Sequence, residues 1–217
     1  MPFFIVYQDI TAMAVDAIVN AANNELRMGG GVCGAIFHAA GAEELQAACA
    51  PLAPIKTGEA VITPGFRLPA RYVIHTAGPV YHDGKSGEEE LLRSCYFRAL
   101  TCAVENGCHS VAFPLISSGI YGYPKDEALQ VATAAIRDFL GSHDLEVFLV
   151  IFDKGSLVIG ERLLGEVESY IDEHYVSEPW EGWCEGQLSV DGINVLSSPF
   201  SPDHKEFAAP ATGLDHL

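Results

Sequence analysis

The feature that most constrains this chain is its regular alternation of strand-like and helix-like segments. Runs rich in β-branched and aromatic residues predict strands at 3–7, 15–20, 60–65, 71–78, 110–116 and 146–152. Apolar residues at helical spacing predict helices at 32–41, 43–50, 87–106, 124–141 and 157–174. This order predicts an α/β fold, a three-layer α/β/α sandwich with a mixed central sheet and most strands covered by helices on both faces.

Two strands carry further signals. The segment 146–152 is almost entirely apolar, which is typical of a buried central strand. Pro114 interrupts the run 110–116, which indicates an edge position or a bulge because proline lacks the N–H that a ladder needs.

The chain of 217 residues suits one domain with an appendage. We expect the domain over 1–175 and an acidic tail or linker over 176–217, where Pro, Gly, Ser and carboxylates dominate. Both tryptophans, Trp180 and Trp183, lie in this tail, and they would fold back on the domain or contact a protein partner. The abrupt end "GLDHL" also fits a fragment of a longer protein.

Composition excludes several classes of partner. The formal charge of −17 argues against general binding to a nucleic-acid backbone. No apolar run reaches the roughly 20 residues of a membrane helix, and the first ten residues lack the pattern of a signal peptide, so we expect a cytoplasmic protein without a membrane contact. The six cysteines show no zinc-ligand spacing and are expected to be reduced and mostly buried, with no metal.

Two glycine-rich loops stand where a predicted strand passes into a predicted helix. The first runs from Asn23 to Val32 and contains Gly29, Gly30 and Gly31; the second is Ser117–Gly122, before a helix that opens with Pro124. Such junctions present unpaired N–H groups and the positive end of a helix dipole, and together they could hold a diphosphate without a lysine. No Walker loop is present, and the glycine spacing of residues 29–34 does not stand directly after the first predicted strand, as a dinucleotide-binding fingerprint requires.

The segments "QDIT", "VDAIVNAAN", "GGGV", "LPARYVIHTAGP" and "AFPLISSGIYGYP" resemble, in order and spacing, the macro domains of the MacroD type over about residues 3–174. This resemblance implies binding of ADP-ribose or of an ADP-ribosylated protein, with no cofactor. It also implies removal of ADP-ribose from acidic side chains, or deacetylation of O-acetyl-ADP-ribose.

The resemblance also implies roles for particular residues. Asp9 would accept a hydrogen bond from the adenine amino group, and Ile10 would supply a backbone contact. Alternatively, Asp9 could cap a turn. Asn23 would bind the distal ribose, or serve only as a turn asparagine. Phe152 would pack on adenine, or belong to the core. Tyr121 would cover the distal ribose. The diphosphate would contact the two loops at Gly30, Gly31, Val32, Ser118, Gly119, Ile120, Tyr121 and Gly122.

Cys33 is the main departure from the family pattern, which has an aspartate there in hydrolytic members. A neutral thiol is a poor general base, so slow or substrate-assisted hydrolysis, with Asn23 and Cys33 as the candidate catalytic residues, competes with a non-catalytic reader of ADP-ribosylated proteins. A thiol at a helix start could also be a nucleophile with His38 as its base, but a five-residue separation places the two on different helix faces. His75 is interpreted as structural.

Overall fold

The computed structural model describes residues 3–151, 188–190 and 193–196. The strands are β1 (Phe3–Tyr7), β2 (Ala17–Ala22), β3 (Ala60–Pro64), β4 (Tyr72–Ala77), β5 (Ser110–Pro114), β6 (Glu146–Ile151), β7 (Leu188–Val190) and β8 (Ile193–Leu196). The helices are α1 (Gly31–Ala40), α2 (Ala42–Cys49), α3 (Glu88–Glu105) and α4 (Lys125–Leu140), with a 3₁₀ turn η1 (Ile10–Ala12).

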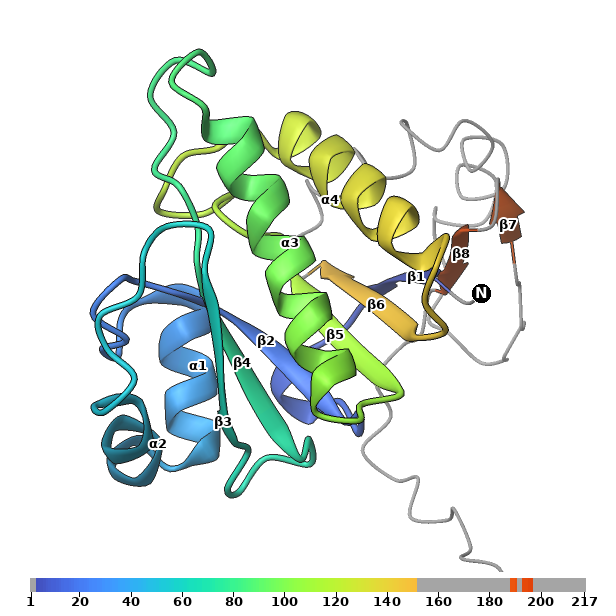
Figure 1. Ribbon diagram of the computed structural model, residues 1–217. Helices are drawn as coiled ribbons and strands as arrows, with labels where there is room; N and C mark the ends of the chain where they lie inside the picture. The colour runs from blue at the N-terminus through green and yellow to red at the C-terminus, as the bar shows by residue number, and fades with distance from the viewer. Residues whose placement is uncertain (1–2, 152–187, 191–192, 197–217) are drawn as a thin grey trace, which may run out of the picture.

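The described strands form one mixed sheet in the order β3-β4-β2-β5-β6-β1-β8-β7 (Figure 1). Neighbours from β4 to β8 are parallel, whereas the outer pairs β3–β4 and β7–β8 are antiparallel. Two apolar cores lie on opposite faces of this sheet: α3 and α4 pack on one, and α1 and α2 on the other. The predicted α/β/α sandwich with a mixed sheet is therefore confirmed.

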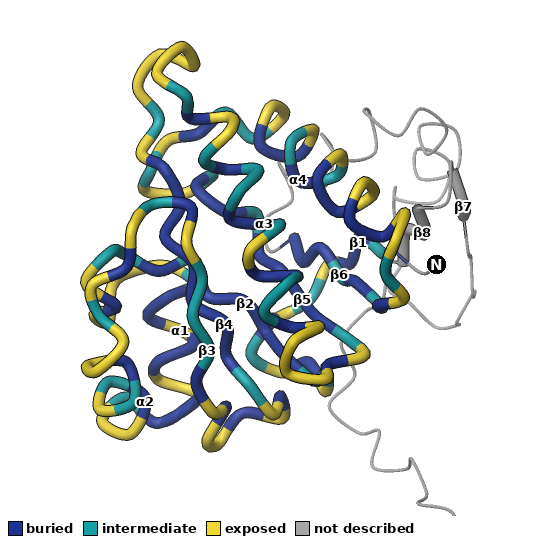
Figure 2. Tube along the Cα trace, viewed as in Figure 1, coloured by how far each residue is buried: buried dark blue, intermediate teal, exposed yellow. Residues whose placement is uncertain are grey.

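Strand residues alternate between these two cores. Val19 faces the core of α3 and α4, and its neighbour Ile18 faces the core of α1 and α2. Because both faces are covered, the central strands are buried along their length, as Figure 2 shows. This double burial explains the nearly unbroken apolar sequence of β6.

The interpretation of Pro114 as an edge or bulge residue is wrong. β5 lies inside the sheet, between β2 and β6. Proline is tolerated there because it is the last residue of the strand, and the pairing of β5 with β2 stops at Ala112. Similarly, β2 starts two residues later than predicted, because the Asp16 carboxylate accepts from the backbone N–H groups of His109 and Ser110 just before the strand.

The acidic segment 176–217 contains two strands that the sequence pattern did not reveal. β8 pairs with β1 in parallel, and β7 continues the sheet beyond it. Several predictions fall outside the described residues: Phe152, the helix over 157–174, Trp180, Trp183 and Cys184.

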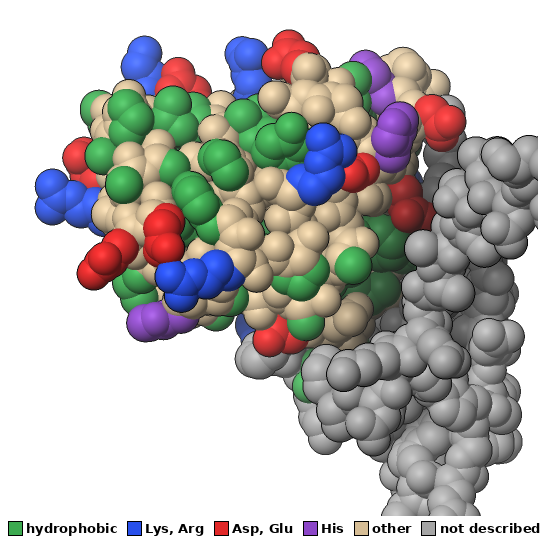
Figure 3. All heavy atoms as spheres, turned by 90° about the horizontal axis from the view of Figure 1, so that it is seen from below, with side chains coloured by type: hydrophobic (Ala, Val, Ile, Leu, Met, Phe, Trp, Pro, Cys, Tyr) green, Lys and Arg blue, Asp and Glu red, His purple; other side chains and the backbone are tan. Residues whose placement is uncertain are grey.

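Charged groups on the described surface are mixed in sign. On the face shown in Figure 3, the Lys and Arg side chains stand singly, most of them close to Asp or Glu. One ion pair joins Arg93 to Asp138, with 2.6 Å between Nη2 and Oδ2, and links α3 to α4. Within the described part of the chain, no helix is long and apolar enough to cross a membrane.

Candidate functional site

The two glycine-rich loops meet at one edge of the sheet. β1, β2, β5 and β6 run parallel, so the loops that leave their carboxyl ends gather at the same edge, which is where open α/β sheets bind ligands. The first loop follows β2 and the second follows β5, its neighbour in the sheet. A Cβ added to Gly30 would lie 3.4 Å from the Cδ1 atom of Ile120, so the loops come into contact at their tips.

The first loop passes into α1 without a capping side chain. Gly30 occupies the N-cap in an extended conformation, and Gly31 has a φ of +61°, a backbone conformation that side chains disfavour. The first turn of α1 therefore offers backbone N–H groups to a ligand rather than to a cap. Close packing also requires Gly34, because a Cβ there would stand 2.6 Å from the carbonyl oxygen of Gly29.

Asn23 closes a turn within the first loop. Its Nδ2 donates to the carbonyl of Arg27 at 2.8 Å, and its Oδ1 accepts from the N–H of Arg27 at 3.1 Å. The turn role predicted as the alternative is thus present in the structure. Asn23 and Cys33 also stand close together, since a Cβ at Gly29 would be 3.7 Å from Asn23 Nδ2 and 3.9 Å from Cys33 Sγ.

The second loop is folded by its own backbone. The N–H of Gly122 donates to the Gly119 carbonyl, and that of Tyr123 to the Ser117 carbonyl, both at 3.0 Å. The N–H of Ser118 donates to the Leu115 carbonyl at 3.4 Å. In the described part of the chain the N–H groups of Gly119, Ile120 and Tyr121 have no internal acceptor. Three consecutive free donors ahead of the uncapped start of α4 make an arrangement suited to an anion.

A tyrosine from the preceding loop supports the second loop. The N–H of Tyr81 donates to the carbonyl of Tyr121 at 2.9 Å, and its ring packs at 4.9 Å from that of Tyr123. Ile120 itself is 83% exposed at the tip, where Gly30 of the first loop lies next to it. The backbone of residues 119–121 is thereby fixed while its outer face stays open.

Asp9 and Ile10 lie where β1 ends. Asp9 Oδ1 accepts from both the N–H (2.9 Å) and the hydroxyl (2.7 Å) of Thr11, so the carboxylate caps η1. Asp9 itself is exposed, and Ile10 is buried beneath it in the core of α1 and α2. The turn-capping alternative is therefore realised, and it leaves the second carboxylate oxygen of Asp9 open.

The two histidines near Cys33 differ in their surroundings. Cys33 is buried whereas His38 is exposed, which agrees with their predicted placement on different faces of α1. His75 is fully buried at 0% exposure, and burial lowers its pKa to about 4, so it is neutral near pH 7. The structure thus places His75 inside the fold, away from solvent.

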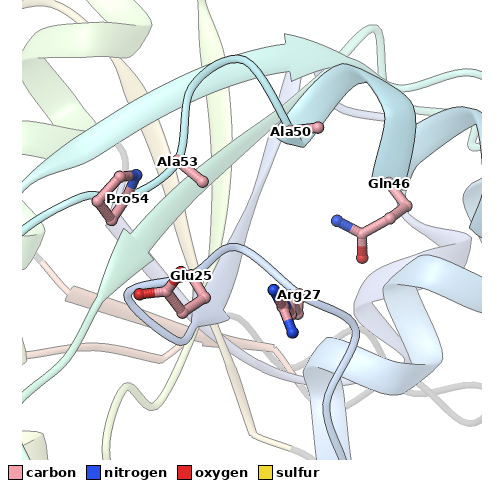
Figure 4. A pocket seen from close by; sticks show the side chains of 6 residues that line it. All are labelled: Glu25, Arg27, Gln46, Ala50, Ala53 and Pro54. Carbon is pink, nitrogen blue, oxygen red and sulfur yellow. The ribbon is translucent and has the colours of Figure 1, made fainter.

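A hollow of about 280 Å³ adjoins the first loop (Figure 4). Its walls come from that loop, from α2 and from the segment after α2, through Glu25, Arg27, Gln46, Ala50, Ala53 and Pro54. Gln46 spans one wall: its Oε1 accepts from Met28 N–H at 3.1 Å and its Nε2 donates to the Leu26 carbonyl at 3.2 Å. This hollow lies behind the turn of Asn23 rather than between the glycine loops. No group of three or more metal-ligating side chains occurs among the described residues.

The fold is an α/β/α domain in which two glycine loops meet at one edge of the sheet. The family model described as "Macro domain" matches residues 19–132, and this chain belongs to the macro domain family.

Among curated relatives, a macro domain-containing protein of Chlorobaculum tepidum is 56% identical over 61% of this chain and 76% of its own length. An O-acetyl-ADP-ribose deacetylase of Escherichia fergusonii is 46% identical over 72% of this chain and 91% of its own.

Solved structures agree. The macrodomain of Oceanobacillus iheyensis with ADP matches with a TM-score of 0.69 and 41% identity, over 73% of this chain and 88% of that one. The Trypanosoma brucei macrodomain in complex with ADP-ribose matches with a TM-score of 0.67 and 39% identity, over 74% of this chain and 68% of that one. The resemblance seen in the sequence is confirmed.

Proposed function

We propose that this protein binds ADP-ribose, free or attached to a protein, with the diphosphate held between the two glycine loops. The observation that carries the proposal is the row of free N–H groups at 119–121 opposite Gly30. A diphosphate satisfies such donors without a cation, which suits a chain of net charge −17. Relatives solved with ADP and with ADP-ribose support the same ligand class.

In this proposal the other site residues each contact a different part of the ligand. Gly30, Gly31, Val32, Ser118 and Gly122 shape the diphosphate channel. Tyr121 and Asn23 contact the distal ribose, and Asp9 with Ile10 contacts the adenine. Asn23 keeps its turn when it binds, because a carbonyl oxygen and an N–H₂ group can each make more than one hydrogen bond.

Calorimetric titration with ADP-ribose tests this binding. We expect a one-to-one complex that Asn23→Ala weakens by about ten-fold, the size of one or two hydrogen bonds. Gln130→Ala, an exposed position on α4, is the matched control and should bind as the wild type does. Absence of binding to ADP-ribose by a folded wild-type protein would refute the proposal.

A second candidate function is hydrolysis of O-acetyl-ADP-ribose or of ADP-ribosyl esters, favoured by the name of the Escherichia fergusonii relative. In the first reaction, water adds to the acetyl carbon and the bond to the ribose oxygen breaks. The ribose oxygen then takes a proton, and acetate leaves. Cys33 offers no carboxylate to accept the proton from water, so the rate should lie about 10²–10⁴-fold below that of an enzyme with a general base.

A time course of ADP-ribose release from a glutamate-linked ADP-ribosylated protein separates enzyme from reader. Turnover by the wild type that is lost in Asn23→Ala identifies a hydrolase that works without a carboxylate at position 33. No turnover by the wild type, with turnover gained in Cys33→Asp, identifies a binding module.

A further inference from the structure

A buried row of polar side chains runs from the outer strands toward the first glycine loop. Asn20 on β2 and His75 on β4 are directly paired across the sheet, and both are 0% exposed. Asn20 Nδ2 lies 3.1 Å from His75 Nδ1, and His75 Nε2 lies 2.9 Å from the hydroxyl of Thr63 on β3. Such groups are costly to bury unless they are hydrogen-bonded to one another.

The orientation of the Asn20 amide, with Nδ2 toward His75 and the buried Oδ1 without a hydrogen-bond partner among the described residues, sets the direction of each bond. An amide nitrogen can only donate, so His75 Nδ1 is the acceptor and the ring proton is on Nε2. Nε2 therefore donates to the Thr63 oxygen. The row is thus directional, and a neutral His75 orients the amide of Asn20 from behind.

The same amide reaches Cys33 at the start of α1. Asn20 Nδ2 lies 3.7 Å from Cys33 Sγ, and Sγ lies 3.8 Å from the carbonyl oxygen of Arg27. That carbonyl is the one to which Asn23 Nδ2 donates at 2.8 Å. The carbonyl of Arg27 therefore joins the buried row to Asn23.

We propose that Cys33 is a positioning residue: its thiol, oriented by Asn20, donates to the Arg27 carbonyl and holds the turn that presents Asn23 to the ligand. The role requires a donor at position 33. A thiol or a hydroxyl can donate to the carbonyl, whereas an alanine methyl group or an ionised carboxylate cannot. The inference rests on the proposed function for its ligand, and it gives Cys33 a task that needs neither a nucleophile nor a base.

Affinity for ADP-ribose in three variants tests the role. Cys33→Ala should raise Kd about three- to ten-fold, as expected for one neutral hydrogen bond, while Cys33→Ser should stay within about two-fold of the wild type. Cys102→Ala, half-buried on α3 and packed against the other core, is the matched control and should leave Kd unchanged. Equal Kd values for Cys33→Ala, Cys33→Ser and wild type would overturn the proposal.

A double-mutant cycle shows whether Cys33 acts through Asn23. If it does, the loss caused by Cys33→Ala should disappear when Asn23 is already alanine. If the full loss persists in that background, Cys33 affects the ligand by another route and the proposal fails. A purely structural thiol would lower the melting temperature in Cys33→Ala and leave Kd as it was, which also overturns the proposal.

The orientation of Asn23 can be followed without any ligand. In ¹⁵N-edited NMR spectra of the free protein, the side-chain amide signals of Asn23 should move in Cys33→Ala and stay in place in Cys33→Ser and Cys102→Ala. Unmoved signals in Cys33→Ala contradict the proposal. A wild type that fails to bind ADP-ribose while these signals respond would refute the proposed function and leave the positioning role intact.

Discussion

The two glycine loops lie at the same edge of the sheet but are built in different ways. The first has main-chain bonds at Asn23 and Asn24, and its middle is held by side chains, since Asn23, Cys33 and Gln46 all bond to the backbone between Leu26 and Met28. The second is held by main-chain bonds at both ends, from Tyr123 to Ser117 and from Tyr81 to Tyr121. The first loop should therefore respond to side-chain substitutions, and the second to changes of backbone conformation.

The largest expected effect comes from pH, through the buried row behind the first loop. Burial lowers the pKa of His75 from 6.5 to about 4, so between these values the unfolded chain binds a proton that the folded protein does not. Stability from this group is complete above pH 6.5 and is lost as the pH falls toward 4, by about 3 kcal/mol. Urea denaturation across pH 4–7 measures this loss.

His75→Gln should flatten that part of the pH profile, and the exposed His38→Gln should leave it as in the wild type. Amide hydrogen exchange sharpens the comparison, because protection should decrease earlier on acidification in residues 23–33 than in residues 115–124. A profile that keeps its slope in His75→Gln would mean that other groups carry the acid sensitivity, and that the first loop does not depend on this row.

The extent to which the site was predictable follows the same division. Local signals placed the ends of elements well, because glycines precede α1 and Pro124 precedes α4, and both helices begin within a residue of the prediction. Long-range pairing was not predictable. Asn20 and His75 are 55 residues apart and become neighbours only when β2 pairs with β4. His75 could therefore be interpreted as structural, while its contact to Asn20, and the contact of Asn20 to Cys33, stayed hidden.

Pro114 and Asp16 illustrate the same limit. The effect of a proline in a strand depends on whether a neighbour needs its N–H, and the register with β2 ends before it. The start of β2 depends on the Asp16 carboxylate, which accepts from the N–H groups of His109 and Ser110. These residues lie 93 and 94 positions further along the chain. In both cases the deciding partner is distant in sequence.

An intermediate effect is expected from the side chain that spans the hollow behind the first loop. Gln46→Ala removes the acceptor for Met28 N–H and the donor to the Leu26 carbonyl, and should cost about 1–2 kcal/mol of unfolding free energy. ADP-ribose affinity should fall as well, because the turn of Asn23 loses its support. Chemical denaturation and calorimetry measure the two effects.

Gln130→Ala is the matched control, because it removes the same kind of side chain from the exposed face of α4. Among the described residues, Gln130 makes no hydrogen bond to the backbone of a loop. It should change stability by less than about 0.5 kcal/mol. Equal losses in Gln46→Ala and Gln130→Ala would show that the first loop holds its shape without this amide, which would weaken the contrast between the loops.

The smallest effect is expected in the second loop. Ser118 Oγ donates to the Leu115 carbonyl at 2.8 Å, but the Ser118 N–H donates to that same carbonyl at 3.4 Å, so Ser118→Ala leaves the carbonyl with a donor. Stability and ADP-ribose affinity should change by no more than about 0.5 kcal/mol, because only a partly exposed, duplicated bond is lost. Calorimetry of Ser118→Ala beside Asn23→Ala gives the comparison directly. A loss in Ser118→Ala as large as that in Asn23→Ala would mean that side chains shape the second loop too, since its main-chain bonds would then be insufficient to keep the N–H groups of 119–121 in place.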